Sequence, residues 1–385
     1  MKRVTILSSA DPRQKRGLQI VALTHAISLR KYGLETVIYC PSSEYESFEL
    51  EGVPVYTFAF QRRSNSLLNF ATMINNCWHG WKHHFGKQEP DILHGHDYMT
   101  YYFLSQYLSQ NVKKIFTVHD PMIYHHRMLG RLSQGSSLKA KIMTHIENKV
   151  YERSSKIHCI SEYTLVRIEN KEALVPKLKI VADWIDVDKF IVPVDKNRER
   201  LELGFGASDF VIYTLRGLQA RMGLENLIEA FQLIKASIPS AKLVIGGKGS
   251  LRNELEELAR RLDISDSVTF LGYVPEDEVV KRYQAADVVI MPSIDGEGFG
   301  LPVIEAMACG TPVLAAPTCA LPEVLRGKPE RLFTGIYPED ISSGIMQFYQ
   351  QWRANRIDAK AERKYVLDHF SEDKMIKLIL DDYEV

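Results

Sequence analysis

The residues best suited to chemistry lie in the segment Ser293–Ala316, which reads SIDGEGFGLPVIEAMACGTPVLAA. Pro302 suits the first positions of a helix, and Gly310 with Pro312 would end that helix. The backbone amides of residues 298–303 would then be left unpaired at the positive end of a helix, where a phosphate group binds readily. Three alternating glycines in the preceding loop would let a ligand approach the backbone closely: Gly296, Gly298 and Gly300.

Two carboxylates bracket this predicted phosphate site. Glu297 lies in the loop, and Glu305 lies about one turn inside the expected helix. A carboxylate beside a phosphate is electrostatically unfavourable unless it accepts hydrogen bonds from hydroxyl groups, so Glu297 suits a sugar and Glu305 a ribose. The alternatives are favourable placement of Glu305 in the first helical turn and a tight glycine turn without any ligand.

The stretch EGFGLPVIEAMACGTPVLA, with seven residues between its two glutamates, resembles the signature of the retaining glycosyltransferases of family 4. The resemblance covers nearly the whole chain and is strongest over residues 210–325. It implies an α/β chain with the GT-B fold, in which two doubly wound Rossmann-like domains face each other across a cleft. The other segments that agree, in order, are TVHD (117–120), ISEYT (160–164), VADWIDVDKF (181–190), MGLENLIEAF (222–231), LVIGGKG (243–249) and FLGYVPEDEV (270–279).

The resemblance also implies roles for matched residues. Glu297 would contact hydroxyls of the transferred sugar, and Glu305 would contact the ribose of the nucleotide. His119 would reach the donor sugar near the reacting carbon; the alternative is a core or turn histidine. The other matched donor-site residues would offer amides to the diphosphate (Phe299, Gly300, Leu301), flank the base (Tyr273, Val274) or complete these loops (Gly249, Gly298, Val303).

The sequence departs from the family pattern where two cations are expected to hold the diphosphate. The family usually has an Arg and a Lys after the first strand of the C-terminal domain, but TLRGLQARMG places Gly217 and Met222 there. Arg221, and secondarily Arg216, is predicted to supply the positive charge from one position away. An ordinary surface arginine is the alternative for Arg216.

A second departure lies near the N-terminus. Family members often show two adjacent glycines after the first strand, whereas DPRQKRGL contains only Gly17, which is predicted to approach the diphosphate. The usual Asn-Gly turn is also replaced, by Asp183-Trp184, and no ligand role is assigned to it.

Metal and cofactor chemistry is not expected. His94 and His96 alternate as on one strand face, which would allow zinc, but a structural or acceptor-side role is favoured. No DxD motif is placed for a nucleotide diphosphate. The nucleotide sugar is therefore predicted to act as a co-substrate, with no metal and no other cofactor.

Alternating short β-branched runs and helical patterns predict parallel strands with crossover helices in both halves. The predicted domains are 1–192, on the acceptor side, and 193–370, on the donor side. A C-terminal helix, 371–385, would stay with the second domain or pack back on the first. Predicted strands include 4–8, 114–118, 210–214, 242–246 and 288–291.

Composition and charge limit the remaining possibilities. Five scattered cysteines without CxxC spacing predict neither disulfides nor a thiolate zinc site, and no signal peptide or membrane span is expected. Residues 1–190 carry 25 Lys/Arg against 18 Asp/Glu, a net charge of +7, which would suit an anionic acceptor or membrane surface; ordinary variation among surface charges is the alternative. The expected location is the cytoplasm, with peripheral contact at the inner face of the membrane.

The resulting prediction is a retaining, metal-independent hexosyltransferase. It would move a sugar from a UDP-sugar, or secondarily a GDP-sugar, to a glycan, a lipid-linked saccharide or a small molecule, without a nucleic-acid partner. The alternatives are a non-catalytic sugar-nucleotide-binding subunit and a sugar-nucleotide epimerase of the same fold.

Overall fold

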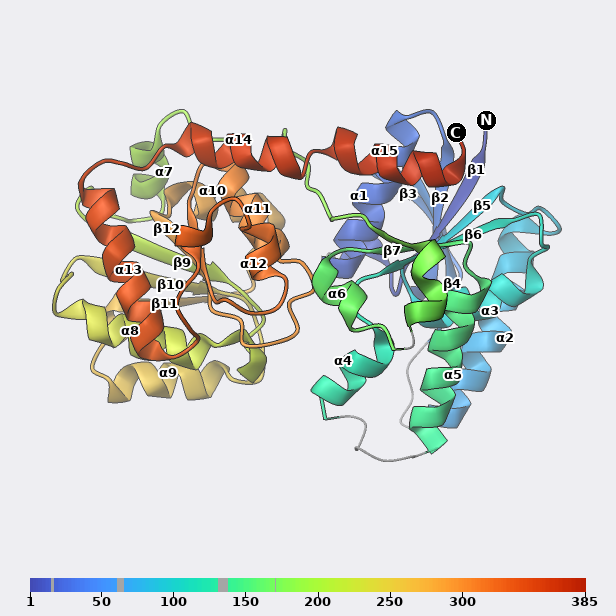
Figure 1. Cartoon of the computed structure of the whole chain (residues 1–385), viewed down its shortest axis with the longest axis horizontal. Coiled ribbons are helices and arrows are strands. Elements are labelled where there is room, and N and C mark those ends of the chain that lie inside the picture. Colours follow the sequence, from blue (N-terminus) through green and yellow to red (C-terminus); the bar gives the residue numbers. More distant parts are fainter. Residues whose placement is uncertain (15–16, 61–65, 131–137, 170) are drawn as a thin grey trace. The chain divides into compact units, whose positions relative to one another are not determined.

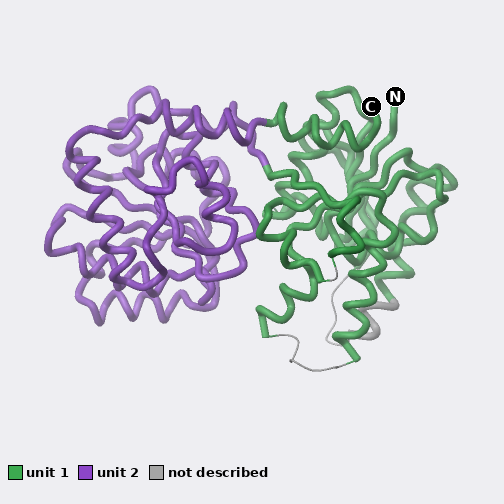
Figure 2. The backbone as a smooth tube through the Cα atoms, in the orientation of Figure 1, with its two compact units in different colours: residues 1–183, 372–385 green, residues 184–371 purple. Residues whose placement is uncertain are grey.

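The computed structural model describes residues 1–14, 17–60, 66–130, 138–169 and 171–385. The chain divides into two compact units (Figure 2). Unit 1 comprises residues 1–183 and 372–385, and unit 2 comprises residues 184–371. Each is an α/β body built around one mainly parallel sheet.

Unit 1 contains an eight-stranded sheet in the order β3-β4-β2-β1-β5-β6-β7-β8. Neighbouring strands are parallel except for β3, which pairs antiparallel with β4 at one edge. All four residues of β5 are buried, as expected for a parallel strand covered on both faces. The strands are β1 (Arg3–Leu7), β2 (Glu35–Ser42), β3 (Ser47–Leu50), β4 (Val53–Ala59), β5 (Ile92–Gly95), β6 (Lys113–Val118), β7 (Lys156–Cys159) and β8 (Leu178–Ile180).

Helices cover both faces of this sheet (Figure 1). The first helix, α1, packs against β2 and the C-terminal helix α15, whereas α2 packs on β4 and α3, and α3 packs on α5. The helices of unit 1 are α1 (Gly17–Lys31), α2 (Ser66–Phe85), α3 (Tyr98–Tyr107), α4 (Met122–Met128), α5 (Leu138–Arg153), α6 (Glu162–Val166) and α15 (Glu372–Tyr383). Within the described ranges, no helix is both long and apolar enough to cross a membrane.

Unit 2 contains a five-stranded parallel sheet in the order β11-β10-β9-β12-β13. Helices α8, α9 and α13 form one packed group, and α7, α10, α11 and α14 form another. The strands are β9 (Phe210–Leu215), β10 (Ala241–Gly246), β11 (Val268–Gly272), β12 (Val288–Met291) and β13 (Val313–Ala315). The helices are α7 (Lys196–Glu202), α8 (Leu224–Lys235), α9 (Arg252–Arg261), α10 (Glu276–Ala285), α11 (Leu301–Ala308), α12 (Leu321–Val324), α13 (Pro338–Arg353) and α14 (Ala359–His369).

Helix α8 illustrates how sequence spacing builds the core of unit 2. Leu224, Leu227, Ile228 and Phe231 repeat with helical spacing and are all completely buried. They form one cluster with apolar residues of β9, β10 and α13. Full burial of each such side chain contributes about 1.5–3 kcal/mol, so this face fixes α8 against the sheet.

The division between the units falls at Asp183–Trp184, nine residues before the predicted boundary after residue 192. The intervening segment packs with unit 2: Trp184 is buried, and the ring of Phe190 lies 6.4 Å from that of Tyr283. Arg363 on α14 also donates to the Phe190 carbonyl. These contacts, rather than the polar stretch that follows, determine where unit 2 begins.

The C-terminal helix α15 belongs to unit 1. Asp382 accepts hydrogen bonds from His158 Nε2 at 2.9 Å and Lys179 Nζ at 3.0 Å. The hydroxyl of Tyr383 lies 2.6 Å from His94 Nδ1. Polar contacts with β5, β7 and β8 therefore hold the end of the chain on unit 1.

Candidate functional site

The polar residues of unit 2 gather where the order of its strands reverses. From β9 the chain moves outward through β10 to β11, and then returns to β12 on the other side of β9. The loops that follow β9, β10 and β12 hold Arg216, Gly249 and Glu297. In open parallel sheets this crevice, at the carboxyl ends of the strands, is where ligands bind.

The loop before α11 offers backbone donors at this position. Gly300 has a φ of 102° and immediately precedes α11, which has no side-chain cap. Among the hydrogen bonds of the described residues, none pairs the N–H groups of Phe299, Gly300 or Leu301, whereas Val303 donates to the Gly300 carbonyl. Three donors at the positive end of a helix are suited to binding an anion.

Arg216 and Glu297 form a buried ion pair beside this loop. Arg216 is 6% exposed, and its Nη2 pairs with the Glu297 carboxylate and donates to Ser293 Oγ at 2.6 Å. The sulfur atoms of Met222 and Met291 lie 3.1 and 3.4 Å from the guanidinium nitrogens. Since Glu297 offsets its charge, Arg216 here orients that carboxylate. Ser293, which the sequence reasoning missed, could have been singled out as a serine two residues after the end of β12.

Arg221 differs from Arg216 because no described carboxylate forms an ion pair with it. It is half-buried, and its Nη1 donates to the Gly296 carbonyl at 2.8 Å. Its own carbonyl accepts from Ile294 N at 2.8 Å, so the two loops are tied together. A cation is therefore held against the glycine loop with its charge available to an anion.

Glu305 lies on α11, half-buried, and accepts a hydrogen bond from the hydroxyl of Tyr283 at 2.8 Å. Burial raises the pKa of Glu305 to about 7, and the bond from Tyr283 partly opposes this rise. A carboxyl group that is poorly solvated in this way gains from a ligand that donates hydroxyl groups. Tyr283 was not singled out from the sequence, where nothing distinguishes it from other helix aromatics.

The predicted base-binding residues lie after β11. Tyr273 is 55% exposed, and Val274 is buried. Lys248 Nζ lies 5.3 Å from the centroid of the Tyr273 ring, a cation–π contact that the sequence reasoning missed. A side chain at Gly249 would place its Cβ 2.1 Å from the Leu218 carbonyl oxygen, so only glycine fits there.

In unit 1, His119 and His96 lie at the carboxyl ends of the neighbouring strands β6 and β5. His119 Nε2 is 2.9 Å from His96 Nδ1. Burial lowers the pKa of His119 to about 4, so its ring is neutral at pH 7. The structure describes the two units separately, and it therefore does not relate His119 to Glu297.

Gly17, the other predicted residue of unit 1, opens helix α1. No atom lies within 4 Å of the position that a Cβ would occupy there, so its surroundings are open. Residues 15 and 16 lie outside the described part of the chain.

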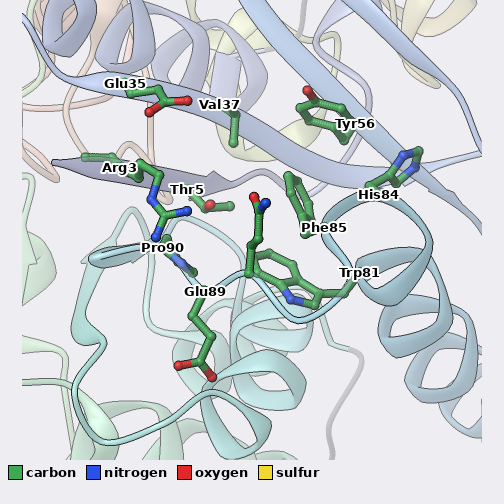
Figure 3. A pocket seen from close by; sticks show the side chains of 12 residues that line it. Arg3, Thr5, Glu35, Val37, Tyr56, Trp81, His84, Phe85, Glu89 and Pro90 are labelled. Carbon is green, nitrogen blue, oxygen red and sulfur yellow. The ribbon is translucent and has the colours of Figure 1, made fainter. Parts of the chain in front are cut away.

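Unit 1 contains a cavity of about 170 Å³ (Figure 3). Arg3 and Glu35 line it at the amino ends of β1 and β2, with Tyr56, Trp81 and Phe85 among its aromatic residues. His119 follows the carboxyl end of β6, so this cavity lies at the opposite edge of the sheet. Across the described ranges, no cluster of three or more His, Cys, Asp or Glu side chains could hold a metal ion.

Comparisons with known proteins match both halves of the chain to glycosyltransferase families. The family described as "Glycosyl transferases group 1" matches residues 195–364, and "Glycosyltransferase Family 4" matches residues 15–189. A relative from Methanocaldococcus jannaschii, "Uncharacterized glycosyltransferase MJ1607", is 28% identical over 309 residues, covering 78% of this chain and 76% of the relative.

One further relative and one solved structure carry information about nucleotides. The "GDP-mannose-dependent monoacylated alpha-(1-6)-phosphatidylinositol monomannoside mannosyltransferase" of Corynebacterium glutamicum is 34% identical over 150 residues, 37% of this chain and 39% of that protein. The crystal structure of Anabaena Alr3699/HepE in complex with UDP and glucose superposes with a TM-score of 0.76 at 18% identity, covering 99% of this chain and 98% of that one. This likeness shows the GT-B fold, with two Rossmann-like domains.

Proposed function

Because the chain belongs to the group 1 glycosyltransferases of the GT4 type, enzymes that transfer sugars, we propose that it moves a sugar from a nucleoside diphosphate sugar to an acceptor hydroxyl. The observation that carries this proposal is the loop before α11. It combines unpaired amides for an anion with Glu297 and Glu305, two carboxylates suited to hydroxyl groups.

The charges in unit 2 suit the bond that must break. Cleavage of the bond between the sugar and the diphosphate develops positive charge on the sugar and negative charge on the leaving phosphate. Donors fixed in advance around the phosphate stabilise that transition state without needing to reorganise. The amides of residues 299–301 and the guanidinium of Arg221 would do so here, and we propose that the reaction needs no metal.

The carboxylate of Glu297 would hold hydroxyls of the transferred sugar, because Arg216 already fixes its orientation. Glu305 would accept hydrogen bonds from the ribose. On the family pattern the anomeric configuration would be retained, with the leaving phosphate taking the proton of the acceptor hydroxyl.

We propose a UDP-sugar as the first donor to test and a GDP-sugar as the second. The UDP-bound Anabaena structure and the GDP-mannose-dependent corynebacterial relative support these two choices. The acceptor would be a glycan, a lipid-linked saccharide or a small molecule. The net charge of +7 over residues 1–190 suits an acceptor that carries anionic groups or lies at the inner face of the membrane, and we place the enzyme in the cytoplasm.

The test measures donor hydrolysis and thermal stabilisation with UDP-glucose, GDP-mannose and ADP-glucose. Arg221→Ala is expected to lower kcat for the accepted donor by about 10²–10³-fold, the usual effect of removing one donor to developing charge. Glu297→Gln is expected to lower kcat by a similar factor while keeping an oxygen that accepts from Arg216.

Matched controls separate these effects from general damage. Arg356 and Glu229 are exposed residues of unit 2, so Arg356→Ala and Glu229→Gln are expected to keep wild-type activity. The proposal fails if no donor stabilises the protein or turns over, or if Arg221→Ala is as active as Arg356→Ala.

A further inference from the structure

The His119 ring uses one of its two nitrogens for a hydrogen bond within unit 1, so the other nitrogen is available to bind a substrate. Its Nε2 lies 2.9 Å from His96 Nδ1, so this nitrogen is already hydrogen-bonded within unit 1. His119 is half-buried, whereas His96 is 3% exposed. The hydrogen bond between them therefore runs from the loop that follows β6 into the interior of unit 1. The nitrogen that remains available to a partner outside the pair is Nδ1 of His119.

His96 is itself held firmly by its neighbours. Its ring stacks on that of His94 with centroids 4.8 Å apart and contacts the edge of His25 at the same distance. His94 is fixed in turn, because its two nitrogens lie 2.6 Å from the Tyr383 hydroxyl and 2.7 Å from Thr117 Oγ1. The His96 ring therefore presents its Nδ1 in one direction.

The same cluster keeps both rings neutral. Burial lowers the pKa of His96 well below its ordinary value, and neighbouring histidines would repel any charge placed on it. A bond between two neutral imidazoles contains one proton, which one ring donates and the other accepts. The packing of this cluster thus disfavours a charged His119.

We propose that His96 is a positioning residue for His119: it holds that ring neutral and in one orientation, so that Nδ1 is the nitrogen that remains for a substrate. The inference rests on the proposed function and on the role that the family resemblance implies for His119, which is contact with the donor sugar. His119 then acts as a fixed hydrogen-bonding group and not as a cation or a general acid.

The kinetic test replaces His96 in two ways. His96→Leu removes the bond and is expected to lower kcat by about 10- to 100-fold, the effect of misplacing a group near the reacting atoms, with the donor KM changed less than about threefold. His96→Asn keeps an amide near the position of Nδ1 and is expected to recover kcat to within about fivefold of the wild type. His79→Leu, at an exposed histidine of the same unit, is the control. The inference is overturned if His96→Leu keeps kcat within twofold, or if His96→Asn is no better than His96→Leu.

A second measurement needs no donor and no activity. Ring nitrogen NMR of histidine-labelled protein, assigned with His119→Gln, is expected to show His119 as one neutral tautomer between pH 6 and 8. In His96→Asn the tautomer remains single, and in a folded His96→Leu the two tautomers average. Titration or tautomer averaging of His119 in the wild type would overturn the inference even if His96→Leu fails to fold. If His119→Ala keeps full activity while the NMR result holds, it is the proposed role of His119 that fails and not its positioning.

Discussion

Glu305 gives a prediction in which stability and function oppose each other. Burial raises the pKa of this carboxyl to about 7, from an ordinary value of 4.5. Between pH 4.5 and 7 the folded state therefore binds more protons than the unfolded state, so the free energy of unfolding falls as the pH rises through this window. The destabilisation is absent below pH 4.5 and complete above pH 7.

The substitution Glu305→Gln removes the charge but keeps an oxygen that can accept from the Tyr283 hydroxyl. A shift of this size sets a ceiling of about 3 kcal/mol at pH 8. Because Glu305 is only half-buried, water reduces this value, and we expect a gain of about 1–2 kcal/mol. For a unit of this size the gain corresponds to a rise in Tm of roughly 2–8 °C.

The assay compares the Tm of Glu305→Gln and of the wild type at pH 5 and pH 8, with Glu229→Gln at an exposed position as control. The difference in Tm is expected to be small at pH 5 and several-fold larger at pH 8. The stabilised variant is also expected to bind the donor about tenfold more weakly, because an amide oxygen is a weaker acceptor for ribose hydroxyls than a carboxylate. A Tm difference that is equal at the two pH values would refute the burial argument.

Three further predictions concern other buried charges. Burial alone would raise the pKa of Asp382, but its hydrogen bonds to β7 and β8 outweigh burial and lower this pKa to about 2. Asp382→Asn should therefore reduce the free energy of unfolding in urea by about 2 kcal/mol at pH 7. The difference between variant and wild type should vanish as the pH falls from 3.8 to 2. Burial raises the pKa of Asp183 to about 7, so Asp183→Asn should raise the Tm at pH 8 more than at pH 5, and an equal rise at both would contradict the assignment. Arg216→Met leaves the Glu297 carboxylate without its arginine partner and should destabilise unit 2 by about 3 kcal/mol. In a double-mutant cycle measured by urea unfolding, adding Glu297→Gln should restore part of this loss, whereas purely additive effects would show that the two side chains are not coupled.

Much of the fold was accessible from local patterns. The predicted strand at 288–291 matches β12 residue for residue, because apolar runs of this kind stop at polar or turn residues. The pair β3 and β4 was missed, since it forms an edge hairpin with partly exposed strands. The boundary between the units was displaced because the contacts of Phe190 with Tyr283 join residues far apart in sequence.

The candidate site was predictable in its backbone and less so in its side-chain partners. The glycines before α11 and the proline in its first turn follow from turn and helix chemistry, which acts over a few residues. The partner of Arg216 could not be read in this way, because Glu297 lies 81 residues further along the chain. Likewise, only the parallel arrangement of β5 and β6 brings His96 to His119.

The two units differ in how they treat charge, and the proposed reaction accounts for the difference. In unit 2, Arg221 forms no ion pair with any described carboxylate and is held against the loop that carries the amides of residues 299–301, which suits a leaving group that gains negative charge. Unit 1 keeps His119 neutral by burying it among other histidines. A charged imidazolium near the transferred sugar would repel the positive charge that develops there, whereas a neutral ring can still hydrogen-bond a hydroxyl group. A neutral histidine in unit 1, and in unit 2 an arginine that forms no ion pair with a described carboxylate, would each suit one of the two charges that develop in the proposed reaction.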